Sequence, residues 1–281
     1  MKRLIVSADD FGLTPSINEG ILRAASEGIV TNINLISTGP ASDDAIALIK
    51  YHKIREIGAH LALTGTRPTT SLRLIASIVD KDGLLPDTRI GLIKRLLGGH
   101  IDMEHVRIEL NSQVDKAAHS GARITNLSFH EHLHMIPAIF GIVSGIAKER
   151  GISYLRVLKS EPITPPPSVD KIFRSILVAY FSPGMERMIK KSGLKAADNF
   201  LGFLDSGDIS EGLLLTMLGG LKDGVTELVT HPGFLSKDIL RHHRFHINCE
   251  EELYALTSPK VIRAIADMGI TLSKYGDLAA G

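Results

Sequence analysis

The stretch that decides the fold is residues 4–36, LIVSADDFGLTPSINEGILRAASEGIVTNINLI. It opens with the apolar run Leu-Ile-Val, which is typical of a buried parallel strand, and this run leads to two aspartates. Thr14 and Pro15 predict a helix start, because threonine caps the first turn and proline fits the first helical position. Gly28 predicts the helix end, and the apolar residues at 29–36 predict a second strand. Strand, helix and strand in this order indicate a parallel α/β fold.

The pattern of strand followed by helix recurs along the rest of the chain. Further strands are predicted at 57–63, 123–128, 152–157, 226–229 and 270–272, and further helices at 42–50, 103–120, 137–150 and 250–267. Strands that alternate with helices in this way favour an irregular, TIM-like (β/α) barrel. An open doubly wound sheet is the alternative.

Composition and charge exclude several classes of protein. The 281 residues include 32 Lys+Arg and 31 Asp+Glu, a net charge of +1, which is unlike the basic balance of a nucleic-acid-binding protein. Hydrophobic residues make up 44% of the chain, which is enough for a core, so global disorder is excluded. No apolar run is long enough to predict a transmembrane helix.

The single cysteine, Cys249, excludes a disulfide within the chain and fits a reducing compartment. The N-terminal sequence MKRLIVSADDF lacks the long apolar region of a signal peptide. We therefore expect a cytoplasmic protein whose mature chain begins at Met1.

Residues 160–197 are predicted to leave the barrel as an excursion within a single domain, 1–281. The three prolines at 165–167 are incompatible with a helix or a β ladder. The segment after them is amphipathic, and Pro183-Gly184 is predicted to break it.

The excursion carries an apolar stripe at helical spacing. Its residues are Phe173, Ile176, Leu177, Tyr180 and Phe181. A barrel of this size already buries its own helices, so the stripe needs a further surface to cover it. We expect the stripe to pack across a homodimer interface or over the barrel mouth as a lid, and the homodimer is preferred.

Asp9 and Asp10 follow the first strand directly, at the carboxyl edge of the sheet where barrel sites form. Adjacent side chains on an extended backbone point to opposite faces, so a turn must bring both carboxylates to one site. One carboxylate would then bind a metal ion while the other serves as a base. A helix-capping or turn pair is the alternative.

A second polar cluster, HEHLH at 130–134, follows the strand predicted at 123–128. Alternate histidines in an extended segment share a face, and three imidazoles with a carboxylate are typical of a metal site. The spacing differs from the HExxH zinc motif, whose histidines lie four apart on a helix. One or two of the histidines would reach the metal, and the others would bind substrate or orient the ligands. A solvated polar loop is the alternative.

Three more polar residues interrupt or follow apolar strands. His60 lies inside a predicted strand, and Arg156 and His231 stand at the ends of two others. The structural alternative for His60 is a histidine of the core. For Arg156 it is a surface ion pair, and for His231 it is a helix-capping or surface histidine. If it does not form such an ion pair, Arg156 could bind an anion or the hydroxyl groups of a sugar. The histidines His242, His243 and His246, in contrast, lie in a polar stretch that is predicted to be a solvated loop.

These residues share one physical pattern. Asp9, Asp10, His60, the cluster at 130–134 and His231 lie at or near the ends of separate predicted strands, and in a parallel barrel those ends converge on one mouth. A carboxylate and two imidazoles with open coordination positions form a standard hydrolytic metal site.

Six segments, spread from end to end of the chain, carry a resemblance to a known family. They are LIVSADDFG at 4–12, INEGI at 17–21, GAHLAL at 58–63, HEHLHMIP at 130–137, DNFLG at 198–202 and TELVTHPG at 226–233. In order and spacing they resemble the YdjC-type carbohydrate deacetylases, which include chitooligosaccharide deacetylases and hopanoid-biosynthesis-associated relatives. The Asp-Asp and His-x-His-x-His segments are the specific ones.

The resemblance implies an irregular (β/α) barrel related to polysaccharide deacetylases, which removes acetyl groups from N-acetylated sugars with a divalent metal. It implies that Asp10, His60 and His130 bind the metal. It implies that Asp9 is the base and that His231 assists the leaving group. Mg²⁺ is the metal that the resemblance suggests, whereas histidine ligands favour borderline metals such as Zn²⁺. Members of the family are often dimers.

Further residues are expected to contact the substrate or to support the residues that do: His132, His134, Arg156 and Asp198. Alternation leaves the choice of His130 or His132 as the metal ligand open. Two positions depart from the family pattern, because Ser128 replaces a common aspartate and Glu131 replaces a common glutamine or histidine. A carboxylate at 131 is able to add a ligand or to shift neighbouring pKa values.

We expect metal-dependent hydrolysis of an N-acetyl group on an amino sugar or an amino-sugar conjugate. A metal-dependent phosphoesterase on a similar barrel is the enzyme alternative, and it should show more lysine or arginine near the site than Arg156 alone. A sugar-binding protein with a disabled site is the alternative without catalysis, and an intact set of candidate ligands argues against it.

Overall fold

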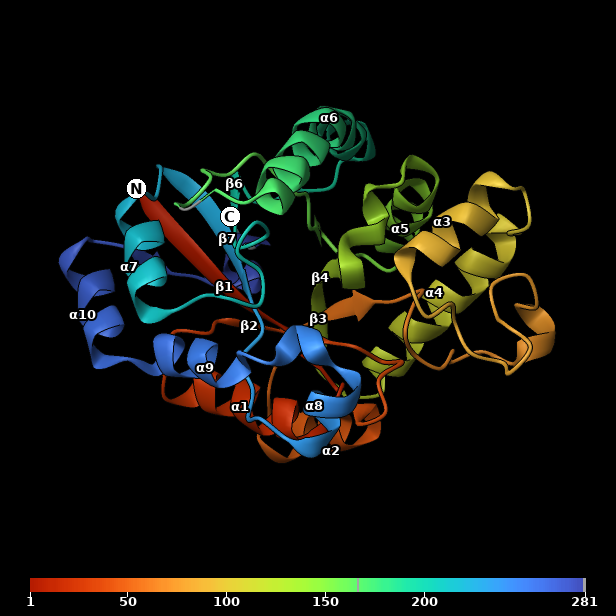
Figure 1. Cartoon of the computed structure of the whole chain (residues 1–281), viewed down its shortest axis with the longest axis horizontal. Helices are drawn as coiled ribbons and strands as arrows, with labels where there is room; N and C mark the ends of the chain where they lie inside the picture. Colours follow the sequence, from red (N-terminus) through yellow and green to blue (C-terminus); the bar gives the residue numbers. More distant parts are fainter. Residues whose placement is uncertain (166, 280–281) are drawn as a thin grey trace.

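The computed structural model describes residues 1–165 and 167–279 of the chain. A curled sheet of parallel strands forms its centre, and helices cover the outside (Figure 1). The strands run in the order β5-β4-β3-β2-β1-β7-β6, and β8 pairs with β1. Their bounds are β1 (Lys2–Phe11), β2 (Asn32–Leu35), β3 (Glu56–Leu61), β4 (Arg123–Phe129), β5 (Tyr154–Leu155), β6 (Asn199–Leu201), β7 (Gly224–Thr230) and β8 (Thr271–Leu272).

Helices link most of these strands. The α-helices are α1 (Pro15–Ser26), α2 (Ser42–Tyr51), α3 (Arg89–Leu97), α4 (Met103–Ala118), α5 (Pro137–Glu149), α6 (Val169–Ser192), α7 (Glu211–Gly219), α8 (Lys237–His242), α9 (Cys249–Thr257), α10 (Pro259–Asp267) and α11 (Tyr275–Ala279). Short 3₁₀ segments are η1 (Leu72–Leu74), η2 (His130–Met135) and η3 (Arg244–His246). Among the helices that the structure describes, none has the length and apolarity needed to cross a membrane.

The two edges of the sheet meet through Lys195. The N–H of Leu155 donates to the carbonyl of Lys195 at 3.0 Å, and the N–H of Lys195 donates to the carbonyl of Ser153 at 2.8 Å. Because β5 and β6 stand at opposite ends of the strand order and Lys195 lies just before β6, this pairing brings the edges together. The expected irregular (β/α) barrel is confirmed.

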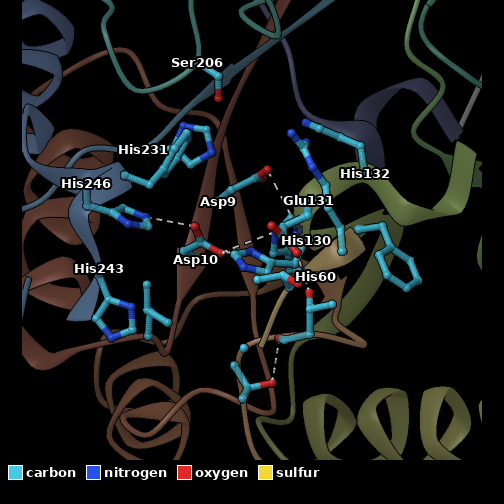
Figure 2. A pocket seen from close by; sticks show the side chains of 18 of the residues that line it. Asp9, Asp10, His60, His130, Glu131, His132, Ser206, His231, His243 and His246 are labelled. Atoms are coloured by element: carbon cyan, nitrogen blue, oxygen red, sulfur yellow. Dashed lines mark hydrogen bonds and ion pairs between the residues drawn. The ribbon is translucent and has the colours of Figure 1, made fainter. Parts of the chain in front are cut away.

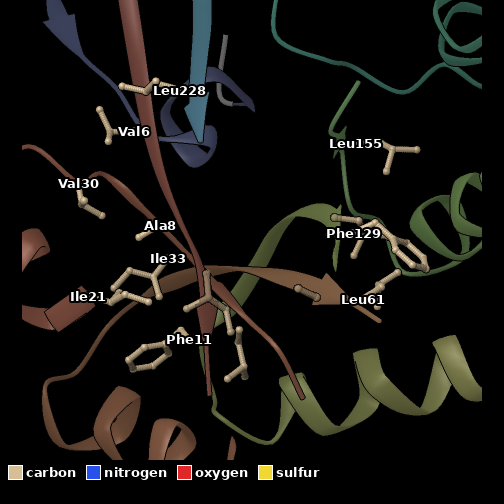
Figure 3. Close-up of a cluster of buried hydrophobic side chains, with 14 of the residues drawn as sticks. Val6, Ala8, Phe11, Ile21, Val30, Ile33, Leu61, Phe129, Leu155 and Leu228 are labelled. Carbon is tan, nitrogen blue, oxygen red and sulfur yellow. The ribbon is translucent and has the colours of Figure 1, made fainter. Parts of the chain in front are cut away.

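The first helix forms as the sequence predicts. The Oγ1 of Thr14 accepts a hydrogen bond from the N–H of Ile17 at 3.2 Å, and Pro15 occupies the first turn. Ile17 and Ile21 are buried on the inner face of the helix. They belong to the main hydrophobic core, which Figure 3 shows around β1 and its neighbouring strands.

The helix expected at 250–267 is two helices, α9 and α10. Ser258 ends α9 and caps α10, where its Oγ accepts a hydrogen bond from the N–H of Lys260 at 3.2 Å. Pro259 occupies the first turn of α10. The helix divides here because a proline disfavours helical backbone at the residue before it.

The break predicted at Pro183-Gly184 is wrong, because α6 continues through both residues. Its buried residues are Val178, Ser182, Met185 and Ile189. Their spacing keeps one face of the helix against the barrel on both sides of the proline. We infer that this packing outweighs the cost of a proline inside a helix, which is roughly 3 kcal/mol. Of the prolines at 165–167, Pro166 lies outside the described residues.

The outer face of α6 stays exposed in a single chain. Phe173 is 59% exposed, Ile176 is 61% exposed and Tyr180 is 78% exposed. The other two residues of the predicted stripe, Leu177 and Phe181, are partly buried. The helix lies at the periphery of the molecule beside α5 (Figure 1).

Candidate metal centre

Asp10, His60 and His130 gather at the carboxyl ends of their strands (Figure 2). Asp10 lies near the end of β1, His60 near the end of β3, and His130 directly after β4. One possible ligand atom from each residue lies within 4.8 Å of the other two. The three residues that the resemblance implied as ligands are therefore placed so that they could hold one metal ion. His132 does not belong to this group in the part of the chain that the structure describes.

A backbone irregularity near the end of β1 brings both aspartates to one site. The register between β1 and β2 shifts between Ala8 and Phe11, and Asp10 has a φ of 66°. This left-handed backbone is uncommon for a residue other than glycine, and it interrupts the alternation of a strand. As a result Asp9 and Asp10 line the same cavity.

The Asp10 carboxylate is buried among imidazoles. Its Oδ1 lies 3.0 Å from Nδ1 of His130 and 3.4 Å from Nε2 of His60. Burial alone would raise the pKa of Asp10, but His130, His246 and His60 outweigh burial and hold that pKa well below its usual range. Asp10 is therefore ionised, which is the form in which a carboxylate binds metal.

The His60 ring is oriented by Ser128, one of the two departures from the family pattern. The Oγ of Ser128 lies 2.8 Å from Nδ1 of His60, while Nε2 faces Asp10. A hydrogen bond to one ring nitrogen determines which nitrogen is left to bind a metal. Ser128 thus leaves Nε2 of His60 on the side of the other candidate ligands.

The backbone of the histidine cluster is turned rather than extended. Residues His130–Met135 form η2, in which Glu131 and His132 have φ values of 52° and 53°. The extended backbone on which the expected alternation rested is therefore wrong, although His130 and His132 line the same cavity. The other departure from the family pattern, Glu131, accepts a hydrogen bond from Oγ1 of Thr64 at 2.7 Å.

The two remaining histidines of the cluster lie apart from the candidate ligands. The His132 ring lines the cavity and meets the Phe203 ring edge-on at 4.9 Å. The His134 ring is completely buried and stacks on Phe129 at 6.0 Å and on Phe140 at 6.4 Å. Burial lowers the pKa of His134 to about 3, so its ring is neutral. His134 is a core residue and does not line the cavity, so the expectation of a substrate contact is wrong for it.

Asp9 is held by a buried arginine. Arg156 donates from Nη1 to Oδ2 of Asp9 at 2.5 Å and from Nη2 to Oδ1 at 2.9 Å. It also donates to Oε1 of Glu227 from Nε at 2.9 Å and from Nη2 at 2.7 Å. Burial alone would raise the pKa of Asp9, but Arg156 and His60 hold it well below its usual range. Arg156 is only 1% exposed, so it supports Asp9 rather than contacting a substrate.

His231 lines the same cavity and lies near Asp9 in Figure 2. Its backbone N–H donates to Oε2 of Glu252 at 2.6 Å, and its ring meets Phe245 edge-on at 4.9 Å. Burial lowers the pKa of His231 to about 4, so the ring is neutral near pH 7. Nδ1 of the ring is buried and has no hydrogen-bond partner among the described residues.

Asp198 lies at the other end of the sheet. It is exposed and accepts a hydrogen bond from the N–H of Val225, at the amino end of β7, at 2.8 Å. The candidate ligands lie at the carboxyl ends of the strands instead. The expectation that Asp198 contributes to the site is wrong.

The sequence model described as "YdjC-like protein" matches residues 3–267. This chain belongs to the YdjC-like protein family. A carbohydrate deacetylase of Thermoanaerobacter pseudethanolicus is 29% identical to this YdjC-like protein over 279 residues, which cover 99% of this chain and 100% of the relative. A carbohydrate deacetylase of Clostridium beijerinckii is 28% identical, with 98% of this chain and 100% of the relative covered.

A crystal structure of a protein from Enterococcus faecalis V583 has the same fold. It superposes on this YdjC-like protein with a TM-score of 0.80 at 24% identity and covers 99% of this chain and 98% of that chain. That protein is provisionally described as a cellobiose-phosphate cleavage protein. The likeness extends over the whole barrel.

The cavity beside the candidate ligands has a volume of about 540 Å³. Part of its wall comes from the predicted excursion, since Arg174 of α6 lines it. Arg89 and Arg244 line it as well, from two other segments. Sequence reasoning placed only Arg156 near the site, and no local pattern distinguishes these arginines from surface residues.

His246 is the site residue that sequence reasoning missed most clearly. It was expected in a solvated loop, but it is only 3% exposed, and its Nε2 lies 2.9 Å from Oδ2 of Asp10 (Figure 2). The spacing of residues in this polar stretch does not distinguish His246 from the histidines beside it. The contact exists only because η3 folds back over the end of β1.

Proposed function

We propose that this protein is a metal-dependent hydrolase that removes the N-acetyl group from an amino sugar or an amino-sugar conjugate. The observation that carries the proposal is the grouping of Asp10, His60 and His130 at a cavity that Asp9 and His231 also line. Relatives named carbohydrate deacetylase, at 28–29% identity over nearly the whole chain, support it.

The donor set fits a divalent metal. One ionised carboxylate and two imidazoles within 4.8 Å of one another leave coordination positions open for water and substrate. A divalent ion held there would polarise the acetamide carbonyl and lower the pKa of a bound water. The resemblance favours Mg²⁺, whereas the two histidines favour Zn²⁺. Elemental analysis of the purified protein decides between them.

Asp9 and His231 both line the cavity and are suited to move protons during the reaction. Asp9 lines the cavity as an ionised carboxylate, so in this proposal it accepts the proton of the attacking water. The low pKa of Asp9 makes it a weak base, so this step depends on the metal lowering the pKa of the bound water. His231 is neutral at rest, so it must gain a proton during the reaction before it donates one to the departing amine.

In this proposal two chains associate through the outer face of α6. The exposed Phe173, Ile176 and Tyr180 on one helix face form an apolar surface of the kind that a second copy would cover. We also propose that residues 1–281 form one domain and that the protein is cytoplasmic, in keeping with its single, buried cysteine, Cys249.

A metal-dependent phosphoesterase is the second candidate. Arg89, Arg174 and Arg244 line the cavity, and that alternative requires basic residues near the site. Arginines at a cavity wall also suit an anionic substituent on an acetylated sugar. The two functions differ in the bond that the protein breaks, which is the amide bond of an N-acetyl group in one and a phosphate ester bond in the other.

The deciding experiment measures acetate and phosphate release by the same preparation. The substrates are N-acetylglucosamine, its oligomers, their phosphorylated forms and simple phosphate esters, each with Mg²⁺, Zn²⁺ or a chelator. Acetate release that needs the metal supports the deacetylase. Phosphate release without acetate release would support the second candidate, and binding without either product would support a sugar-binding protein.

A further inference from the structure

The two oxygens of the Asp10 carboxylate have different partners. Oδ1 faces the candidate ligands, 3.0 Å from Nδ1 of His130 and 3.4 Å from Nε2 of His60. Oδ2 faces the other way, 2.9 Å from Nε2 of His246 (Figure 2). The group of three possible ligands within 4.8 Å of one another contains Asp10 but does not contain His246 among the residues described.

The chemistry of this contact determines where the proton lies. A carboxylate that binds a metal is deprotonated, so both its oxygens are acceptors, and Nε2 of His246 must carry the hydrogen in this contact. Nδ1 of His246 is buried and has no hydrogen-bond partner among the described residues. A buried nitrogen without a partner costs stability, so the imidazole is poorly explained by folding alone.

The orientation of the Asp10 carboxylate decides which oxygen is presented to a metal. A carboxylate without a hydrogen-bond partner could rotate to offer either oxygen or both. Carboxylates that bind metals are generally hydrogen-bonded by neighbours that fix their orientation. His246 is the neighbour in this position.

We propose that His246 is a positioning residue for the metal site. It holds Oδ2 of Asp10 through Nε2–H, so that Oδ1 is presented to the metal beside His60 and His130, and it does not bind the metal itself. This inference rests on the proposed metal-dependent function and adds a residue to it that the family resemblance did not assign. The imidazole arrives from η3, far along the chain from the three candidate ligands.

The test is metal affinity, measured by calorimetric titration of the metal-free protein with Zn²⁺ and with Co²⁺. The variants are His246→Leu, which removes the donor, and His246→Gln, whose side-chain amide can donate from about the position of Nε2. His119→Leu, at an exposed position at the end of α4, is the control for losing one imidazole. Circular dichroism and thermal unfolding establish that each variant is folded.

We expect His246→Leu to weaken metal binding by roughly 10–100-fold, the usual range for a partner of a metal ligand. His246→Gln should recover most of that affinity and keep the visible spectrum of the Co²⁺ form, because the ligand set is unchanged. His119→Leu should bind metal as the wild type does.

Wild-type affinity in folded His246→Leu would overturn the role of His246 and leave the proposed function intact. A Gln variant as weak as the Leu variant, with an altered Co²⁺ spectrum, would overturn it by showing that His246 is itself a ligand. A wild-type protein that binds no divalent metal would overturn the metal site as well as this role. Misfolding of the Leu variant leaves the Gln variant to decide, through its affinity and spectrum.

Discussion

The guanidinium of Arg156 binds both carboxylate oxygens of Asp9, from 147 residues away in the chain, at 2.5 Å and 2.9 Å. Both side chains are almost completely buried, and the same guanidinium also reaches Glu227. Asn34 donates to Asp9 as well, at 2.6 Å. The carboxylate proposed as the base is therefore fixed in place, and its charge is balanced inside the barrel.

Arg156→Met should destabilise the protein by about 3–5 kcal/mol, because it leaves Asp9 and Glu227 buried without their cation. Urea unfolding measures the loss. The control is Arg123→Met, which breaks an exposed ion pair with Glu56 and should have a small effect. Equal stability losses in the two variants would contradict the structural role of Arg156.

Asp9→Asn should lower turnover by roughly 10²–10⁴-fold, because an amide does not accept the proton of water. The metal content should stay as in the wild type, since Asp10, His60 and His130 are unchanged. Some loss of stability is also expected, because the amide N–H₂ faces Arg156. Elemental analysis, unfolding and acetate release together separate these effects. Loss of metal with little other change would mean that Asp9 is a ligand and that the two aspartates exchange roles.

Gly58→Ala should disturb the support of Asp9 without touching the cavity. A Cβ at this position would collide with Oδ1 of Asn34 and with the side-chain amide of Asn126. Asn34 is the residue that donates to Asp9. We expect lower stability and lower turnover with metal affinity retained. Gly141→Ala is the control, because a Cβ there meets no atom within 4 Å.

Removal of metal should lower the thermal stability of the wild type. A ligand that binds only the folded protein adds about 2.7 kcal/mol at a concentration 100-fold above its Kd. Thermal unfolding with chelator, and then with excess Zn²⁺ or Mg²⁺, measures the difference. His60→Ala should remove most of the stabilisation that added metal gives. A melting temperature that does not respond to metal in the wild type would count against the proposed centre.

Stability should depend on pH through Glu161, which does not line the cavity beside the candidate ligands. Burial raises the pKa of Glu161 to about 7, while its carboxylate accepts hydrogen bonds from the N–H groups of Leu204 and Gly202. Between pH 4.5, the reference value, and pH 7 the folded state keeps a proton that the unfolded state has lost. The stability that Glu161 contributes is therefore full below pH 4.5 and falls as the pH rises to about 7.

Urea unfolding of the wild type and of Glu161→Gln at several pH values between these limits checks this sign. The free energy of unfolding of the wild type should fall more steeply with rising pH, by at most about 1.4 kcal/mol per pH unit. Glu19→Gln, at an exposed position of α1, is the control substitution. Parallel curves for the wild type and Glu161→Gln would refute the assignment.

Phe173→Asp/Tyr180→Asp should convert a dimer into a monomer, because both side chains project from the exposed face of α6. The mass in solution, measured by light scattering for the native chain and the variant, reports the change. Lys190→Asp, at an exposed position on the same helix, is the control for the added charge. A native monomer whose double variant keeps full activity would remove both the dimer and the lid.

Much of the site could be predicted from the sequence because its residues follow strands directly. Asp9 and Asp10 after β1, His60 in β3 and His130 after β4 are local features, and the ends of parallel strands converge in any barrel. The family resemblance supplied the roles. Helix starts such as Thr14 and Pro15 were also local, since a cap involves only neighbouring residues.

Other features depended on backbone geometry and packing that no local pattern contains. The left-handed backbone of Asp10, Glu131 and His132 overrode the alternation expected of extended segments. The packing of α6 against the barrel carried the helix through Pro183, although the residue itself favours a break. These outcomes are decided by contacts with the rest of the molecule.

By itself, the sequence determined the alternation of strands and helices and the polar residues at the strand ends, because periodicity, caps and strand ends depend on neighbours in the chain. The choice of Asp10, His60 and His130 as metal ligands came from the family resemblance. Only the tertiary structure decided that Arg156 is a buried partner of Asp9, that His246 holds Asp10 from 236 residues away, and that Asp198 lies at the far end of the sheet. The physical reason is that burial and ion pairing depend on distance in space, and folding brings together residues whose separation along the chain carries no signal of it.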